Sequence, residues 1–372
     1  MLGSSPPTVF VGRVGYPRIN VYPSTPPFIG DTSYLEDSSK WLDMRLEEFI
    51  SARLSLVRGG VSYRAEKASD PDETLLRIQE IAMSSRPVDT HLLLSSRPRG
   101  GFFSEETPPL GPWAPLRRLE LSGSPSVDRV VEKIYYDTDL RASEAVYRLY
   151  TERLGVEKIS SLLSVGALGR SRNRKLVPTR WAITAVDSLV SERLIDEIRF
   201  FPEISEYQVF IREVSGNLFI AILSPTQWMF EWGEAWFPGS TWNPWGLGVE
   251  IEIDYEGNTG RSDYPSIGGC YYASRLAVAE YLHRIRRQAS ALLWREIYPG
   301  FNLPIGVWFV RENIRRMLSQ KPIVVDSFSE ALKIVSSRMR VPLEKWVEKS
   351  FIAKLLLRSR RLEEFSRGVS SR

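Results

Sequence analysis

Apolar residues recur along the chain with two periods, one typical of amphipathic helices and the other typical of strands. Helical spacing predicts helices over Trp41–Val57, Asp70–Ser84, Arg141–Leu154, Glu157–Leu163, Ala182–Ile198, Tyr271–Glu296, Glu312–Leu318, Phe328–Met339 and Leu343–Phe365. Alternating or continuous apolar runs predict strands over His91–Ser95, Leu116–Leu121, Val130–Tyr136, Tyr207–Val214, Leu218–Leu223, Gln227–Phe237, Val249–Tyr255 and Ile305–Val310. Evenly spaced aromatic residues in Gln227–Phe237 are more typical of a packed core than of a base-stacking platform.

Hairpins that alternate with helices predict an α+β fold, with a mixed or antiparallel sheet, surrounding helices and a helical C-terminal region. Turn-forming residues at Asn258–Pro265 predict a boundary between regions. The expected organisation is a loose tail (1–8), an α+β region (9–257), a mostly helical region (266–358) and a basic tail (359–372). The Gly- and Pro-rich segment Arg97–Pro115 is predicted to be a long loop, and loops of that length are often functional or flexible.

The composition is that of a soluble globular protein, because 43% of the 372 residues are hydrophobic and 25% are charged. The formal net charge of +4 permits an anionic partner without requiring one. Cys270 is the single cysteine, and His91 and His283 are the only histidines. The chain can therefore form no internal disulfide and no cysteine-based zinc site, and we expect no cofactor. The sequence shows no signal peptide and no apolar run of ~20 residues, which predicts a cytoplasmic protein with no membrane partner.

Five cations lie within eleven positions that contain no Asp or Glu: Arg170, Arg172, Arg174, Lys175 and Arg180. Such a run is either a solvated loop or faces an anion. Pro178 ends the loop, and Thr179 is expected to cap a helix that begins near Ala182. The N–H groups of that helix and the five cations would then suit a phosphate. Trp181 beside Arg180 favours a nucleic acid strand, because cations next to aromatic rings are a frequent pairing in such sites.

Two closely spaced glycines near the start of the chain interrupt a short strand-like run, in the segment VFVGRVGYP (Val9–Pro17). The segment does not fit a dinucleotide-binding fingerprint, because no Gly-x-Gly-x-x-Gly leads into a helix. The glycines could let a ligand approach the backbone beside Arg13 and Tyr16. The alternative interpretation is a tight turn between two strands.

Three segments resemble the archaeal Nre family of DNA-repair proteins. They are VFVGRVGYP (Val9–Pro17), KLVPTRWAITAVD (Lys175–Asp187) and GGCYYASRLAVAEYL (Gly268–Leu282), and their order and spacing fit the family along nearly the whole chain. The resemblance implies a role in DNA-damage repair through contact with DNA, with a repair partner such as the sliding clamp PCNA, or with both. Many members of the family carry an N-terminal four-cysteine zinc module, which this sequence lacks.

Each of the three segments contains an arginine, so we expect Arg13, Arg180 and Arg275 to belong to one site. The residues predicted to bind DNA are Arg13, Tyr16, Arg170, Arg172, Arg174, Lys175, Arg180, Trp181 and Arg275. No nucleophile elbow, P-loop or histidine-centred acid–base pair is present, so whether the protein is an enzyme stays open and the catalytic residues are unknown.

Carboxylates at alternate positions support a second hypothesis. Glu250, Glu252 and Asp254 would project from one face of a strand, as in a metal-dependent nuclease that holds Mg²⁺ ions at a phosphodiester. The alternative interpretation is the solvated face of an antiparallel strand, where alternating carboxylates are common.

The C-terminal segment Ser359–Ser366 resembles the sliding-clamp-binding peptide that some Nre proteins carry at their end. Leu362 and Phe365 match two anchor positions of that peptide, while Ser359 stands in place of Gln and Ser366 in place of the second aromatic residue. A third hypothesis is therefore an adaptor that PCNA recruits and that makes no contact with DNA. The alternative interpretation of this segment is an ordinary frayed helix end.

Overall fold

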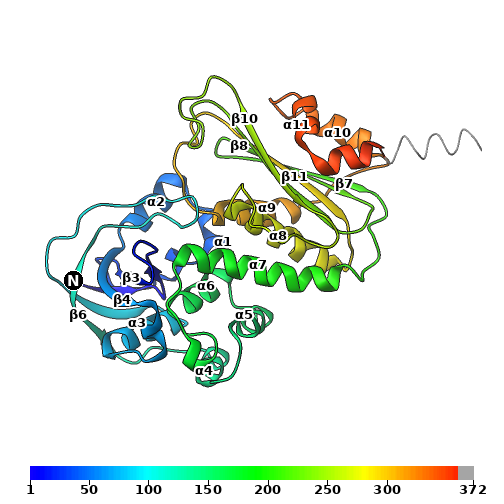
Figure 1. The fold of residues 1–372 in the computed structure, drawn as a ribbon. Helices are drawn as coiled ribbons and strands as arrows, with labels where there is room; N and C mark the ends of the chain where they lie inside the picture. Colours follow the sequence, from blue (N-terminus) through cyan, green and yellow to red (C-terminus); the bar gives the residue numbers. More distant parts are fainter. Residues whose placement is uncertain (359–372) are drawn as a thin grey trace, which may run out of the picture. The chain divides into compact units, whose positions relative to one another are not determined.

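The computed structural model describes residues 1–358, which fold into two compact units (Figure 1). The first unit comprises Met1–Val190 and Ile305–Phe309, and the second comprises Ser191–Pro304 and the chain from Val310 onward. Each unit contains a six-stranded mixed sheet together with helices, and the described C-terminal region is helical. The α+β class predicted from the sequence is therefore confirmed.

The sheet of the first unit has the strand order β1-β5-β6-β4-β3-β2. Its strands are β1 (Leu2–Ser5), β2 (Val9–Val11), β3 (Arg18–Thr25), β4 (Val57–Arg64), β5 (Val88–Leu94) and β6 (Trp113–Ser122). Strands β4 and β6 run parallel, and every other neighbouring pair is antiparallel.

The first residues of the chain do not form the expected loose tail, because β1 is an edge strand paired with β5. The Met1 ammonium group donates to the Leu92 carbonyl at 2.7 Å, and the buried Ser5 hydroxyl donates to the Ser24 carbonyl. A Cβ atom at Gly3 would lie 1.9 Å from the carbonyl oxygen of Pro26. The small residues that suggested a loose tail are therefore the ones that fit between two neighbouring chain segments.

The helices of the first unit are α1 (Ser38–Trp41), α2 (Leu46–Leu54), α3 (Glu73–Met83), α4 (Arg129–Tyr136), α5 (Ala142–Thr151), α6 (Val156–Ser164) and the beginning of α7 (Thr179–Ile198). Helices α3 and α6 pack against the sheet. The predicted helix Trp41–Val57 is split into α1 and α2. The strand predicted over Val130–Tyr136 is wrong, because Val131 and Ile134 are buried one helical turn apart in α4.

The sheet of the second unit has the strand order β10-β9-β11-β8-β7-β12. Its strands are β7 (Tyr207–Val214), β8 (Asn217–Ser224), β9 (Met229–Trp236), β10 (Glu250–Glu256), β11 (Ser290–Ile297) and β12 (Ile323–Val325). Only β9 and β11 run parallel among the described pairs. The predicted hairpin of β7 and β8 is confirmed, and so is the core role of the aromatic stripe, because Trp228, Phe230 and Trp232 are fully buried.

The helices of the second unit are α8 (Gly269–Ile285), most of α9 (Trp308–Leu318), α10 (Phe328–Ser336), α11 (Leu343–Lys349) and a helical segment at 351–358. The single helix predicted over Tyr271–Glu296 is wrong: α8 ends at Ile285, the next residue Arg286 is left-handed with φ 53°, and β11 follows. The strand predicted over Ile305–Val310 is also wrong, because the chain turns at Gly306 with φ 98° and α9 begins at Trp308.

The predicted helix Leu343–Phe365 is interrupted at Ser350, which has an extended conformation. The buried Glu231 carboxylate on β9 accepts hydrogen bonds from the Ser350 hydroxyl at 2.6 Å and from the N–H groups of Phe351 and Ile352 at 2.9 Å each. A distant side chain therefore caps the last described helix, which local periodicity cannot indicate. No helix within residues 1–358 is long and apolar enough to cross a membrane.

Candidate functional site

The two faces of the first unit's sheet differ in chemistry. Val9, Val11 and Val21 are buried on the face that α3 and α6 cover. Because side chains alternate along a strand, the residues between them point to the opposite face. That face carries Phe10 paired with Tyr22, and Arg58 paired with Trp113 in the parallel register of β4 and β6. This opposite face of the sheet is therefore aromatic and cationic.

The loop 95–112 lies over this face and encloses a cavity of about 700 Å³. Its walls are the aromatic strand residues, the turn residues Gly12–Val14, loop residues from Gly100 to Leu110, and Arg180 at the start of α7. All of these residues belong to the first unit. The segment 305–309 contacts the loop, since Val307 donates its N–H to the Glu106 carbonyl and Ile305 forms a parallel β-bridge with Ser104.

Three aromatic rings contact one another along the cavity wall. The centroids of Phe10 and Tyr22 are 5.8 Å apart, and those of Tyr22 and Trp113 are 5.6 Å apart at an interplanar angle of 82°. A Cβ atom at Gly60, between these rings on β4, would lie 2.8 Å from the Tyr22 ring. Glycine at this position therefore allows the rings to lie over the strand and form a wall.

Arg58 is the most unusual polar residue of the cavity, since it is 5% exposed and has no ion-pair partner among residues 1–358. Its Nε donates to the Gly111 carbonyl at 2.9 Å, and its guanidinium lies 5.7 and 5.2 Å from the ring centroids of Phe10 and Tyr22. The described residues offer no hydrogen bond to its two terminal nitrogens. Burial lowers the pKa of Arg58 to about 10, so the cation is retained at neutral pH without a counter-ion.

The segments that contain Arg13 and Arg180 meet at this cavity, and both arginines line it. The Val11 N–H donates to the Thr179 hydroxyl at 2.8 Å, which joins β2 to the start of α7. Thr179 was expected to cap a helix that begins near Ala182. This expectation is wrong, because α7 begins at Thr179 itself and the Thr179 hydroxyl accepts a hydrogen bond from β2. Arg180 forms an ion pair with Glu106 of the loop, an acid that is remote in sequence from the basic run.

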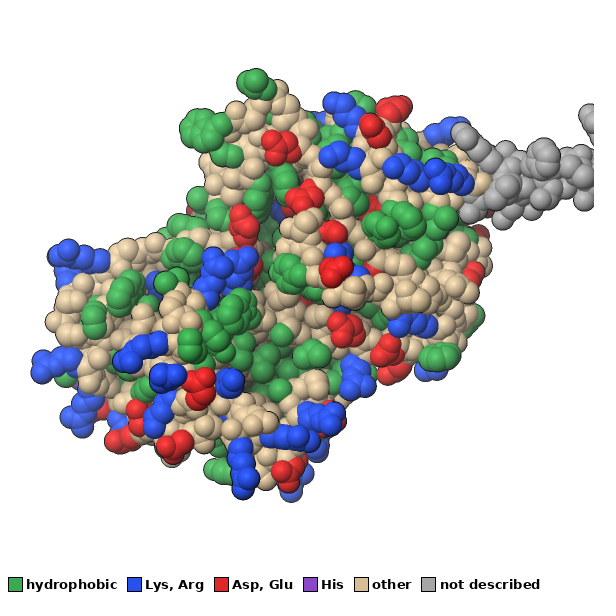
Figure 2. Space-filling view, in the orientation of Figure 1, with side chains coloured by type: hydrophobic (Ala, Val, Ile, Leu, Met, Phe, Trp, Pro, Cys, Tyr) green, Lys and Arg blue, Asp and Glu red, His purple; other side chains and the backbone are tan. Residues whose placement is uncertain are grey.

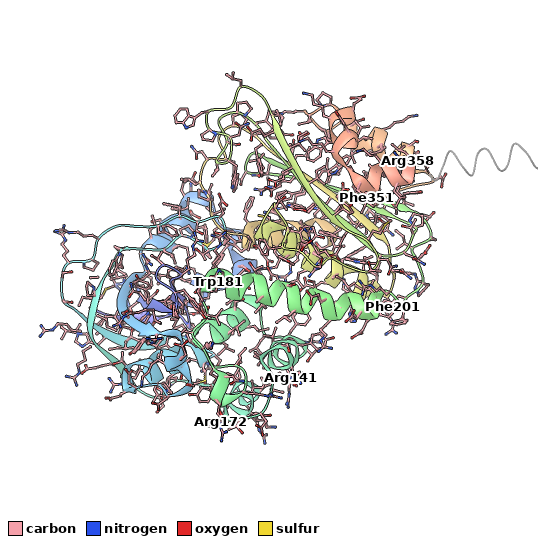
Figure 3. All side chains as sticks on the ribbon, in the orientation of Figure 1. Arg141, Arg172, Trp181, Phe201, Phe351 and Arg358 are labelled. Carbon is pink, nitrogen blue, oxygen red and sulfur yellow. The ribbon has the colours of Figure 1, made fainter. Side chains whose placement is uncertain are left out.

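Tyr16 and Trp181 form an aromatic pair beside the cavity, with ring centroids 5.1 Å apart. Both side chains are between 40 and 46% exposed, so their outer surfaces are accessible. Figure 3 shows Trp181 at the first turn of α7. The Arg13 side chain is exposed and has no hydrogen-bond or ion-pair partner among the described residues.

The rest of the basic run lies near α4, where Figure 3 labels Arg172. Arg174 is buried and structural: its guanidinium donates to the carbonyls of Gly169 and Tyr135 and stacks on the Tyr135 ring at 4.8 Å. Burial lowers its pKa. Arg170 donates to the Asp139 carbonyl, whereas Arg172 and Lys175 are exposed and unpaired among residues 1–358. Figure 2 shows Lys and Arg side chains with hydrophobic groups between them on the visible face of this unit.

Arg275 lies in the second unit, on α8, and its guanidinium is buried. It forms ion pairs with Glu256 at 2.8 Å and Glu192 at 3.4 Å, and its Nε donates to the Ser191 hydroxyl. The ring of Tyr272 covers it at 5.0 Å. The structure therefore brings Arg13 and Arg180 to one cavity, while Arg275 takes part in an ion-pair network of its own unit.

Of the three carboxylates that the nuclease hypothesis uses, Asp254 has structural partners. Asp254 accepts hydrogen bonds from Arg261 at 3.2 Å, from the Ser266 hydroxyl at 2.9 Å and from the Ile267 N–H at 3.1 Å. Asp254 therefore holds the loop that follows β10 through these hydrogen bonds. Glu250 and Glu252 lie on the same face as Asp254. No group of three or more His, Cys, Asp or Glu residues within residues 1–358 is placed to hold a metal ion.

Sequence reasoning missed Phe10, Tyr22, Arg58 and Trp113 as a group. The available signal was weak: aromatic residues alternate with buried valines in two short strands, and an arginine precedes two glycines in a third. Leu362 and Phe365, the residues predicted to bind the clamp, lie outside the described residues.

The protein is therefore of the two-unit α+β class, and its first unit holds a cavity with aromatic and cationic walls. Two family profiles match the chain, "Archaeal Nre, N-terminal" over residues 1–243 and "Archaeal Nre, C-terminal" over residues 256–365. The chain belongs to the archaeal Nre family. No solved structure matches it at a significant level.

Three curated relatives are described as DNA repair proteins. DNA repair protein NreB of Archaeoglobus fulgidus is 46% identical over 355 residues, which cover 95% of this chain and 89% of the relative. NreA of the same organism is 38% identical over 342 residues, covering 91% of this chain and 85% of the relative. NreA of Haloferax volcanii is 33% identical over 364 residues, which cover 95% of this chain and 86% of the relative.

Proposed function

We propose that this protein acts in the repair of damaged DNA and that its first unit contacts DNA. The repair role is supported by the three relatives, each described as a DNA repair protein and each similar over most of both chains. The contact with DNA is supported by geometry. The observation that carries it is the exposed pair of Tyr16 and Trp181, which lies beside the cavity that Arg13 and Arg180 line.

An exposed aromatic pair and unpaired cations on the same unit suit a nucleic acid strand for two reasons. Every base has a flat face that can stack on an aromatic ring, and this interaction tolerates any sequence. Arg13, Arg172 and Lys175 are exposed and unpaired among the described residues, so phosphate oxygens can reach them without breaking an existing contact. Arg174 is omitted from the proposed contacts because its donors already bind carbonyls.

Salt dependence of DNA binding tests the proposal. A variant with Arg13→Ala, Arg172→Ala and Lys175→Ala should bind a labelled oligonucleotide with a slope of log affinity against log salt that is about two to three units smaller in magnitude. The matched control removes three exposed charges from the second unit, by Lys333→Ala, Arg338→Ala and Lys345→Ala. The proposal predicts that the control keeps the wild-type slope. Equal slopes for the two triple variants would contradict it.

The nuclease hypothesis has less support. Asp254 is occupied by Arg261 and the following loop, and the described residues contain no metal-binding cluster. The adaptor hypothesis depends on Leu362 and Phe365 and rests on the sequence alone.

A further inference from the structure

The cavity of the first unit contains polar groups that the protein itself does not satisfy. Thr107 is 2% exposed, and its hydroxyl has no hydrogen-bond partner. The terminal nitrogens of Arg58 and the side-chain amide of Asn20 also have no partner among residues 1–358, and all three residues line the cavity. Buried polar groups in folded proteins are nearly always paired, so the unpaired Thr107 hydroxyl and the buried Arg58 without a counter-ion indicate a ligand. The half-buried Asn20 amide adds a third polar group at the same cavity.

The chemistry of the walls limits what this ligand can be. The rings of Phe10, Tyr22 and Trp113 favour a flat group. A buried arginine without a carboxylate favours an anion or a strong acceptor, and the Asn20 amide can both donate and accept. A nucleobase with its phosphate combines a flat face, edge donors and acceptors, and a negative charge.

The size and position of the cavity fit one nucleotide. A volume of about 700 Å³ is in the range of small-molecule sites and cannot admit a duplex. Arg13 lies at the cavity and three residues before Tyr16, whose ring contacts Trp181. A strand bound on the aromatic pair would therefore pass the cavity mouth, where one nucleotide could leave the strand and enter.

We infer that this cavity binds a single nucleotide, with its base between the aromatic residues and its polar groups at Arg58, Asn20 and Thr107. For a nucleotide within DNA, the inference rests on the proposed function, and the cavity would select DNA that contains an unpaired or extruded nucleotide. A free nucleotide has the same chemistry, so the experiment needs separate measurements for the two sources. Extrusion costs least at a mismatched or unpaired base, which links the cavity to damaged DNA.

The experiment compares the full chain with two cavity variants, Asn20→Ala and Trp113→Ala. The first set of titrations uses a perfect duplex and the same duplex with one unpaired 2-aminopurine, whose fluorescence reports stacking. Wild-type protein should prefer the second duplex about tenfold, a ratio in the range of one stacked base. Each cavity variant should reduce this ratio to within about twofold. The control Tyr136→Ala removes an exposed aromatic residue from α4 and should keep the ratio.

The second set titrates free deoxynucleoside monophosphates and follows tryptophan fluorescence. Saturable quenching that Asn20→Ala weakens, without a preference between the duplexes, would support the cavity with a free nucleotide as its ligand. No preference and no quenching would overturn the inference, even if both duplexes bind. If neither duplex binds, the proposed DNA contact fails, and the nucleotide titration still decides the inference. Thermal unfolding of each variant establishes that it is folded, and Asn20→Ala remains informative if Trp113→Ala does not fold.

Discussion

The two sheets have the same number of strands and a single parallel pair each. They differ in whether the buried arginines of their units have carboxylate partners. In the second unit, every residue of β8 and β11 is buried, and the buried Arg275 and Arg295 pair with Glu256 and Glu234. In the first unit, the buried Arg58 has no carboxylate partner among the described residues. A paired buried cation is part of a closed core, whereas an unpaired one beside a cavity indicates a missing anion.

The largest expected effect is on the stability of the second unit. Arg275→Met leaves the Glu256 carboxylate, 2% exposed, without its cationic partner. Removing one partner of a buried pair costs about 3–5 kcal/mol of unfolding free energy. Arg58→Met strands no carboxylate and loses one hydrogen bond to Gly111, which should cost about 1–2 kcal/mol.

Denaturant unfolding of the two variants measures this difference. Met keeps most of the arginine volume in both variants, so neither substitution creates a large cavity and the two losses of stability can be compared directly. A loss of stability for Arg58→Met that equals or exceeds that for Arg275→Met would show that Arg58 is structural and would contradict the comparison.

A half-buried carboxyl of the first unit makes stability depend on pH. Burial raises the pKa of Glu36 to about 7, against the opposing charges of Lys158 and Arg53. Because the folded pKa lies above the unfolded value, this group stabilises the protein at pH values below the unfolded pKa, about 4.5, and the contribution is lost as pH rises through about 7. We expect a loss of about 1–3 kcal/mol between pH 4.5 and 8. Unfolding of Glu36→Gln should lack this decline, and an identical pH profile for the variant would refute the assignment.

A smaller effect is expected for Asp254, which serves as a link between β10 and the loop after it. Asp254→Ala should reduce stability by about 1–2 kcal/mol through the loss of the Arg261 ion pair and the Ser266 hydrogen bond. DNA binding should stay unchanged. If wild-type protein cleaved an oligonucleotide with Mg²⁺ and the variant did not, the nuclease hypothesis would replace the structural role.

The smallest effect is expected from the C-terminal segment. A Lys354–Arg372 peptide that retains Leu362 and Phe365 should bind the sliding clamp at best with micromolar affinity, about −8 kcal/mol, because two of the four anchor positions are missing. Calorimetry beside the Leu362→Ala, Phe365→Ala peptide measures this. Equal heats for both peptides at several hundred micromolar clamp would end the recruitment hypothesis.

The predicted and observed folds differ mainly where an apolar run is short and buried. The hairpin Tyr207–Leu223 was predictable because alternation and turn residues agree. Val130–Tyr136 and the end of Tyr271–Glu296 were assigned to the wrong element, because a short, mostly apolar segment fits a strand and a helix equally well. The break at Ser350 depends on Glu231, whose contact is remote in sequence.

The candidate site was also predictable only in part. Arg13, Tyr16, Arg180 and Trp181 were predictable as a group because each lies within a family motif. The ion pair of Arg180 with Glu106 and the unpaired state of Arg58 were not, since both depend on how a long loop lies over the sheet. Local sequence identifies which residues can contact a phosphate, and tertiary contacts decide which of them are available.

Photocrosslinking tests most directly whether DNA is bound by the first unit. The full chain would be irradiated with an oligonucleotide duplex that carries one unpaired 4-thiothymidine, and the crosslinked peptides would be identified by mass spectrometry. The proposed site predicts crosslinks to the peptides that contain Phe102 or Trp113, which line the cavity and are partly exposed. Crosslinks confined to residues of the second unit, from Ser191 to Pro304 or beyond Val310, would contradict it.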